Sequence, residues 1–338
     1  MKAIVVKQEK TRPFLIWEDV PDIRCNSEEV LVDVKATAVN RADLLQAQGL
    51  YPPPPGESEI LGLEMAGIVS AIGDGVEGWQ PGDRVLSLLA GGGYAEQAAV
   101  HHHMLIRLPD DWSFTQGAAV PEVWLTAFVN LFWEGKLKAE ETVLIHAGAS
   151  GVGTAAIQMA REIESFVCAT AGSEPKLSRC RDLGATVAVN YKEQDFLEEV
   201  LNRTKGKGVD VILDPVGGSY LERNLKLLNE NGRLVNIGLL GGASAELNLG
   251  LVLGKSLRII GSRLRSRPLP EKIDITQAFK KQFWSLLEDG TLQPVVDRVF
   301  PIQEAQNAHH FVQQNKNIGK VVLEVSETEF DPLCRSRS

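Results

Sequence analysis

The sequence predicts an α/β protein of two domains, one rich in short strands and one built on a doubly wound parallel sheet. The chain has 338 residues, 44% of them hydrophobic, which suffices for about two domains with sizeable cores. Short alternating runs broken by proline and glycine fill its first third, and strand-like and helix-like segments alternate from about Trp124. That alternation suits a parallel sheet, because parallel neighbours need a crossover helix.

Residues 1–121 have the pattern of the β-rich domain. Runs such as 30–34 alternate apolar and polar residues, and clusters such as YPPPPG at 51–56 and GGG at 91–93 interrupt them. The chain starts with strand-like sequence, and no apolar stretch approaches the roughly 18 residues that span a bilayer. We therefore expect a cytoplasmic protein that is neither secreted nor inserted in a membrane.

Charge and cysteine content exclude several classes of partner. The net charge of −9 comes from 44 acidic and 35 basic residues mixed along the chain. No basic face is available to release counterions from a phosphate backbone, so nucleic acid and anionic membranes are not expected partners. The cysteines have no metal-type spacing and are expected to be free thiols in a reducing compartment. They are Cys25, Cys168, Cys180 and Cys334.

The second domain is predicted to begin with the apolar helical segment WLTAFVNLF at Trp124. Six strand-like runs follow, and helix-length segments separate most of them, which indicates a parallel sheet with helices on both faces. From about Arg265 the sequence is mixed again, and 326–338 is predicted to be a loose polar tail. The six runs are 143–145, 166–169, 186–189, 209–213, 233–237 and 257–260.

The stretch HAGASGVGT at 146–154 follows the first of these strands and opens a predicted helix, which is the context of a dinucleotide-binding turn. Gly148 permits the tight turn, Gly151 brings backbone N–H groups to the positive helix end, and Gly153 permits close packing of helix and sheet. Serine at the middle glycine position makes the match imperfect, and a turn without a ligand is the alternative. The candidate contacts are Gly148, Ser150, Gly151, Val152 and Gly153.

The residues after the second strand favour NADP(H) over NAD(H). NAD enzymes normally have an acidic residue about 20 positions downstream of the turn, where this chain has Ala-Gly-Ser ending at Ser173. Ser173 and Lys176 offer a hydroxyl and a cation to a 2′-phosphate, with Gly172 between strand and helix. Tyr191 is a candidate to cover the phosphate or adenine. The alternatives are a solvated lysine and a packing tyrosine.

Together these motifs resemble the zinc-free quinone oxidoreductase branch of the medium-chain dehydrogenase/reductase superfamily. The resemblance covers almost the whole chain, through AVNRADLLQAQGLYPPPPG, ILGLEMAGIVSAIG, GDRVLSLLAGGGYAEQ, EVWLTAF, AGSEPKL, LDPVGG and NKNIGKVVLE besides the glycine turn. It implies a GroES-like catalytic domain at 1–122 and 266–338. It also implies a Rossmann NADP-binding domain at 123–265, with the cofactor cleft at the junction.

The resemblance argues against a metal. Where zinc-bearing relatives have a cysteine and a histidine, this chain has Asn40 and Leu63, and the relatives' four-cysteine loop is absent. The triplet at 101–103 consists of three histidines, but neighbours in an extended strand point to opposite faces, so we expect a surface strand or connector there. Glu64 is left with either a structural role or a hydrogen bond near the cleft.

The resemblance implies that Asn40 and Tyr51 face the nicotinamide end of the cleft. Asn40 offers an amide donor to a carbonyl or ribose hydroxyl, and Tyr51 a hydroxyl that polarises a carbonyl or relays a proton. The alternatives are that Asn40 only caps a helix at 41–46 and that Tyr51 only stacks. Further implied cofactor contacts are Thr126, Gly238, Leu239, Leu240, Gly241, Ser262, Leu264, Arg265, Asn317 and Lys320.

The expected function is an NADPH-dependent quinone oxidoreductase that orients a hydride donor and excludes water. A reduced quinone can take its protons from water, so no dedicated acid is expected. An NADPH-dependent enal or enone double-bond reductase is the second hypothesis, and an NADPH-binding protein with little activity is the third. By analogy with relatives we expect a homodimer formed through the sheet edge at 257–261.

Overall fold

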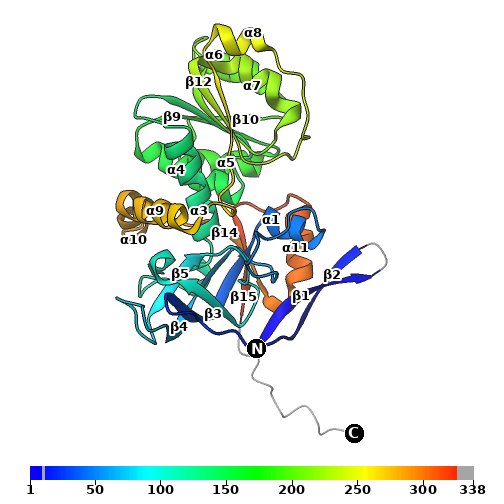
Figure 1. Cartoon of the computed structure of the whole chain (residues 1–338). Coiled ribbons are helices and arrows are strands. Elements are labelled where there is room, and N and C mark those ends of the chain that lie inside the picture. The colour runs from blue at the N-terminus through cyan, green and yellow to red at the C-terminus, as the bar shows by residue number, and fades with distance from the viewer. Residues whose placement is uncertain (10–11, 326–338) are drawn as a thin grey trace.

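The computed structural model describes residues 1–9 and 12–325, whose strands form two large sheets, one above the other in Figure 1. The expected α/β class, with one parallel sheet and one β-rich unit, is confirmed. The predicted polar tail at 326–338 lies outside the described residues. Within the described ranges, no helix is long and apolar enough to cross a membrane.

The first sheet has six strands, all parallel, and forms the upper unit in Figure 1. The strands are β8 (Thr142–Ile145), β9 (Phe166–Ala171), β10 (Val187–Asn190), β11 (Val209–Asp214), β12 (Leu228–Asn236) and β13 (Arg258–Gly261). The helices between them are α4 (Gly151–Glu162), α5 (Glu174–Asp182), α6 (Phe196–Arg203), α7 (Leu221–Leu227) and α8 (Leu249–Gly254). The order β10-β9-β8-β11-β12-β13 is doubly wound, with the direction of growth changing between β8 and β11. All six predicted runs are strands of this sheet.

The second sheet has seven strands and combines residues from both ends of the chain. The strands of this unit are β3 (Glu29–Val39), β4 (Glu64–Ile72), β5 (Arg84–Leu88), β6 (Gln97–His101), β7 (Ile106–Arg107), β14 (Val296–Pro301) and β15 (Lys320–Glu324). A separate ribbon joins β1 (Lys2–Glu9) and β2 (Arg12–Asp19). β15 pairs with β3, and Val321 lies opposite Val39. This pairing brings the C-terminal region beside the first third of the chain.

Helix α3 (Pro121–Phe128) lies between the two units and packs against α4 (Figure 1). It begins three residues before the predicted Trp124, because proline is well suited to the first helical position. The helix continues as a π-helix over Val129–Glu134. The rings of Phe128 and Phe279 meet edge to face, 5.8 Å apart. The other helices are α1 (Arg41–Ala47), α2 (Phe114–Gly117), α9 (Leu269–Phe279), α10 (Ser285–Glu288) and α11 (Ala305–Gln313).

Candidate functional site

The glycine-rich turn connects β8 to α4 and presents backbone N–H groups at the helix start. Ser150 is the N-cap residue, and its hydroxyl accepts a hydrogen bond from the N–H of Gly153 at 3.0 Å. The serine that breaks the glycine pattern therefore has a capping role. The N–H groups of Gly151 and Val152 lie in the first turn, where helical N–H groups have no intrahelical acceptor. Two donors at the positive end of the helix dipole suit a phosphate group.

The turn is packed too closely for side chains at two of its glycines. A Cβ atom on Gly148 would lie 3.0 Å from Sγ of Cys180. A Cβ atom on Gly151 would lie 2.8 Å from both the side chain of Lys320 and that of Val123. The turn therefore lies against β15 and α3 as well as against its own sheet.

A segment from the C-terminal region is joined to the turn by main-chain contacts. The N–H of Gly319 donates to the carbonyl of Ala149 at 2.8 Å, and Ser150 and Gly319 form an isolated parallel bridge. The side chain of Asn317 donates to the carbonyl of Gly319 at 2.7 Å. Asn317, a predicted cofactor contact, therefore lies close to the glycine turn.

The carboxyl end of β9 brings together the residues predicted to bind a 2′-phosphate. The hydroxyl of Tyr191 lies 2.8 Å from where a Cβ atom of Gly172 would be, and Cε of Lys192 lies 3.1 Å from the same point. Ser173 is the N-cap residue of α5, and its side chain makes no capping hydrogen bond. This end of the strand thus has two hydroxyl groups and an ammonium group near a glycine backbone.

Two further cations lie at this place. The ammonium group of Lys176 donates to the carbonyl of Asn315 at 2.6 Å, and Arg41 donates to the side chain of the same asparagine. Burial lowers the pKa of Lys176, and the positive charges of Lys192 and Arg41 add to this while Asp297 opposes it. We call Arg41, Lys176 and Lys192 the cationic cluster. The residues that end β9 and lead into α5, Ala171, Gly172 and Ser173, have no carboxylate, so the cluster is suited to an anion.

A buried ion pair lies where the two chain ends meet. The ammonium group of Lys320 is 2.7 Å from Oε1 of Glu64 and donates to Oδ1 of Asn40, also at 2.7 Å. The amide of Asn40 donates to the same glutamate oxygen at 2.8 Å. Asn40 and Lys320 were predicted to contact substrate or cofactor, but their polar groups bind each other and Glu64. Glu64 therefore has the structural role of holding both.

The contacts of Asn40 and the burial of Leu63 show whether these two positions could bind a catalytic zinc ion. The family resemblance places Asn40 and Leu63 where zinc-bearing relatives have their cysteine and histidine ligands. Leu63 is buried and has no donor atom, and the Asn40 amide is already paired with Glu64 and Lys320. Tetrahedral zinc needs thiolate, imidazole or carboxylate ligands. The residues present at these positions do not fit a catalytic zinc ion.

Asp43 anchors the loop that positions Asn40. Its carboxylate accepts hydrogen bonds from the N–H groups of Asn40 at 2.8 Å and Gly62 at 3.0 Å. Burial raises the pKa of Asp43 to about 6. The hydroxyl of Tyr94 lies 3.1 Å from Nε2 of His309, whose pKa burial lowers to about 4. This polar network is enclosed in the protein and fixes the start of α1.

Tyr51 packs under the guanidinium group of Arg265. The guanidinium carbon lies 5.4 Å from the centre of the Tyr51 ring, and the group also donates to the side chain of Gln46 and the carbonyl of Ala90. Burial raises the pKa of Tyr51, and the negative charge of Glu122 raises it further while Arg265 opposes this. Arg265 thus positions Tyr51, and its own donors are used within the protein.

One face of α3 and of the π-helix that continues it has polar groups without partners. Among the described residues, the buried side-chain atoms that make no hydrogen bond are Oε2 of Glu122, Oγ1 of Thr126 and Oδ1 of Asn130. They are spaced four residues apart, which places them on neighbouring turns of one helix face. Buried polar groups are normally paired, so an unpaired set indicates that a ligand or water completes it. Thr126 was a predicted cofactor contact, whereas Glu122 was not singled out.

The remaining predicted contacts lie at the carboxyl edge of the parallel sheet. The N–H of Gly241 donates to the carbonyl of Val216 at 2.7 Å, so the loop after β12 lies against the turn after β11. The hydroxyl of Ser262 accepts from Arg267, and Leu264 is buried. The loop residues are Gly238, Leu239, Leu240 and Gly241. The glycine turn lies at the same edge, because all these strands are parallel.

The histidine triplet lies at a strand end and in a connector, as expected, but the expected extended geometry is wrong for His102 and His103. The strand β6 ends at His101, and the chain turns at once into a 3₁₀-helix over His102–Met104. The three rings therefore stack instead of pointing to opposite faces, with the centres of the His102 and His103 rings 4.0 Å apart. Donor atoms of Glu28, His101 and His102 lie within 4.8 Å of one another.

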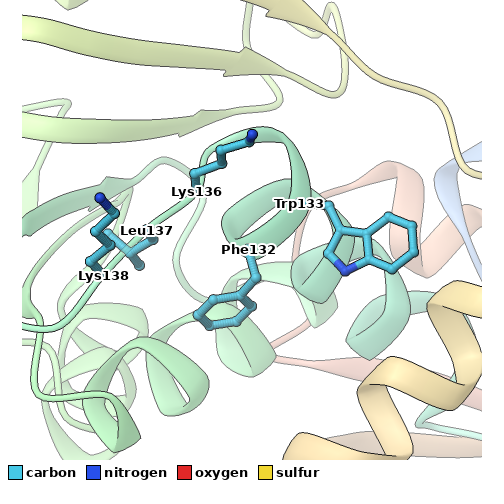
Figure 2. A pocket seen from close by; sticks show the side chains of 5 residues that line it. All are labelled: Phe132, Trp133, Lys136, Leu137 and Lys138. Carbon is cyan, nitrogen blue, oxygen red and sulfur yellow. The ribbon is translucent and has the colours of Figure 1, made fainter.

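An open depression of about 530 Å³ lies at the C-terminal end of the π-helix, and Figure 2 shows the side chains that line it. Phe132, Trp133, Lys136, Leu137 and Lys138 line it, and none of them is a predicted site residue. Its walls hold two lysines and no acidic, hydroxyl or imidazole group. None of the lining residues belongs to the glycine turn, the cationic cluster or the buried ion pair.

Sequence reasoning missed three residues near the predicted site. Lys192 directly follows Tyr191, and Arg41 directly follows Asn40, so adjacency to a predicted contact was an available signal. Glu122 opens the EVWLTAF segment, where an acidic residue at a helix start usually needs only the helix dipole as an explanation. Its burial is visible only in the fold.

Two family models match the chain. The zinc-binding dehydrogenase model matches residues 151–281, and the alcohol dehydrogenase GroES-like domain model matches residues 26–110. The rat (Rattus norvegicus) quinone oxidoreductase is 33% identical over 299 residues, which cover 88% of this chain and 89% of that protein.

Solved structures of oxidoreductases are also similar to this chain. Escherichia coli quinone oxidoreductase complexed with NADPH is 30% identical, with a TM-score of 0.85 over 96% of this chain and 99% of the other. The CurK enoyl reductase is also 30% identical, with a TM-score of 0.83 over 96% of this chain and 99% of the other.

Proposed function

The chain belongs to the quinone oxidoreductases of the medium-chain dehydrogenase/reductase superfamily, and we propose that it is an NADPH-dependent quinone reductase without a catalytic metal. Residues 123–265 form the NADPH-binding domain in this proposal, and residues 1–122 and 266–338 form the catalytic domain. The misfit of Asn40 and Leu63 to zinc supports the metal-free chemistry.

The cationic cluster is the observation that supports NADPH most directly. A 2′-phosphate needs positive charge and donors where an NAD enzyme has a carboxylate. Arg41, Lys176 and Lys192 supply the charge, and Tyr191 and Ser173 supply hydroxyl groups. For the pyrophosphate of the cofactor, the first turn of α4 supplies N–H groups.

Bound NADPH supplies a hydride, which carries two electrons and one proton to the substrate. The chain's own residues hold the reactants in place and keep water out. The hydrogen-bonded network of Lys320, Glu64 and Asn40 holds β15 against the first third of the chain. Arg265 holds the Tyr51 ring in place. Tyr51 offers a hydroxyl donor to the substrate carbonyl, and its raised pKa keeps it protonated at neutral pH.

Replacing Lys176 with alanine is expected to weaken NADPH binding about 10- to 100-fold and to leave NADH binding unchanged. Removing a charge-assisted hydrogen bond costs about 1.5–3 kcal/mol of binding free energy. NADH lacks the 2′-phosphate that would accept this bond, so its affinity does not depend on Lys176. Nicotinamide fluorescence during titration of each cofactor measures both affinities. Lys207→Ala is the control, because that lysine is exposed in the loop after α6. Equal binding of both cofactors to the unmodified protein would contradict the proposal.

An enal or enone double-bond reductase is the second candidate, and the similarity to an enoyl reductase of known structure supports it. The two reactions need the same hydride geometry. Initial rates with a quinone and with an alkenal, measured at equal NADPH concentration, rank them. Tight NADPH binding without turnover of either class would favour a binding protein.

We also propose a homodimer formed through β13, the unpaired edge of the parallel sheet. Ile259 is 41% exposed on this strand, and Leu253 on the adjacent α8 is 84% exposed. Light scattering at micromolar concentration is expected to give twice the 36.9 kDa mass of one chain. Ile259→Lys is expected to yield monomer, since it places a charge on the paired edge. Ile72→Lys, on β4, is the control, and a monomeric unmodified protein would refute the dimer.

A further inference from the structure

Glu122 has an acidic group that none of the roles described above uses. Its backbone N–H donates to Oε2 of Glu64 at 2.8 Å, which fixes the residue at the start of α3. Its carboxyl oxygen Oε2 is buried and has no hydrogen-bond partner. A buried charged carboxylate without a partner is costly, whereas a protonated carboxyl group is a neutral hydrogen-bond donor.

The surroundings of Glu122 are those of the proposed reaction site. Its backbone N–H binds Glu64, whose other oxygen binds Asn40 and Lys320. When Glu122 is ionised it also raises the pKa of Tyr51, the ring on which Arg265 stacks. One turn further along the same helix face, the hydroxyl of Thr126 is also buried without a partner. A ligand that meets the Thr126 hydroxyl therefore lies one helical turn from the Glu122 carboxyl group.

We propose that Glu122 donates a proton to the carbonyl oxygen of the quinone during its reduction, an inference that rests on the proposed function. The hydride brings two electrons and one proton, so a second proton is needed to reach the neutral hydroquinone. The O–H bond of Glu122 breaks as the new O–H bond on the substrate oxygen forms, and the carboxylate that remains takes a proton from water. The sequence had led us to expect that water alone supplies the protons.

Burial keeps Glu122 protonated at neutral pH, because it raises the pKa of this carboxyl group to about 8. Of the neighbouring groups, the carboxylates raise the pKa and the cations lower it. These groups are Glu64 on β4, Asp43 on α1, Lys320 on β15 and Arg265 after β13, with Tyr51 facing the same carboxyl group.

Glu122→Gln tests the proposal, because glutamine has the same size and cannot donate an acidic proton. The variant is expected to lower kcat for a quinone about 100-fold while NADPH affinity changes less than about twofold. The unmodified enzyme should lose kcat as the pH rises through about 8, and the variant should show no such loss. Glu198→Gln, which removes an exposed carboxylate of α6, should behave like the unmodified enzyme.

A readout independent of turnover is the pH dependence of unfolding without cofactor. Between the ordinary glutamate value of 4.5 and about 8, the unfolded chain releases a proton that folded Glu122 keeps. Stability therefore falls with rising pH in this window, and the variant should gain stability relative to the unmodified protein until about pH 8.

The outcomes separate the two proposals. Absence of NADPH binding or quinone turnover in the unmodified protein refutes the proposed function itself. Normal turnover with an unchanged kcat and pH profile in Glu122→Gln refutes only the role of Glu122. If the variant does not fold, a kcat of the unmodified enzyme that stays constant from about pH 6 to 9 refutes that role equally.

Discussion

Replacing Lys320 with methionine is expected to lower the free energy of unfolding by about 3–5 kcal/mol. The side chains of Lys320 and Glu64 are 4% and 0% exposed, so the substitution leaves a carboxylate buried without its cation. It also removes the donor that Oδ1 of Asn40 and the carbonyl of Val39 accept from. Urea unfolding of the cofactor-free protein at neutral pH measures the loss.

The matched control is the double variant Lys320→Met with Glu64→Gln. Removing both charges leaves no unpaired ion, so much of the lost stability should return. Adding the single variant Glu64→Gln completes a double-mutant cycle, which isolates the coupling of the two charges. A single variant that unfolds within about 0.5 kcal/mol of the unmodified protein would show that the buried pair contributes nothing.

The secondary structure of the parallel sheet followed from local sequence. Each of its strands is a short apolar run between helix-length segments, and that pattern needs no knowledge of distant residues. The glycine turn was predictable for the same reason, because strand, turn and helix are contiguous. Even the serine at position 150 has a local explanation, since an N-cap is a nearest-neighbour effect.

The polar contacts of the site were not predictable, because they join distant parts of the chain. Lys320 and Glu64 are 256 positions apart, and Lys176 and Asn315 are 139 apart. Family resemblance placed Asn40 and Lys320 near the cofactor, but it did not reveal that their polar groups bind each other. The geometry of the histidine triplet was missed for a different reason. The strand ends at His101, so His102 and His103 lie in a 3₁₀-helix, and sequence defines element boundaries poorly.

Replacing Gly153 with valine is expected to weaken NADPH binding by more than about 100-fold and to destabilise the fold by about 3 kcal/mol. A Cβ atom at this position would lie 2.5 Å from the carbonyl oxygen of Ala147 and 2.6 Å from the carbonyl of Gly148. Both neighbours are backbone of the same tight turn, and Ala147 already has a positive φ of 52°. Neither can move without reshaping the turn.

Helix α4 would therefore shift away from β8, and the N–H groups of Gly151 and Val152 would leave the positions in which we propose that they bind a phosphate. Gly254→Val in α8 is the matched control, because no atom lies within 4 Å of a Cβ at that position. Its stability should change by no more than about 0.5 kcal/mol, since glycine and valine have similar helix propensities. Fluorescence titration and urea unfolding of both variants measure the two effects. Full NADPH affinity in Gly153→Val would mean that the cofactor does not depend on this turn, and the phosphate site would have to lie elsewhere.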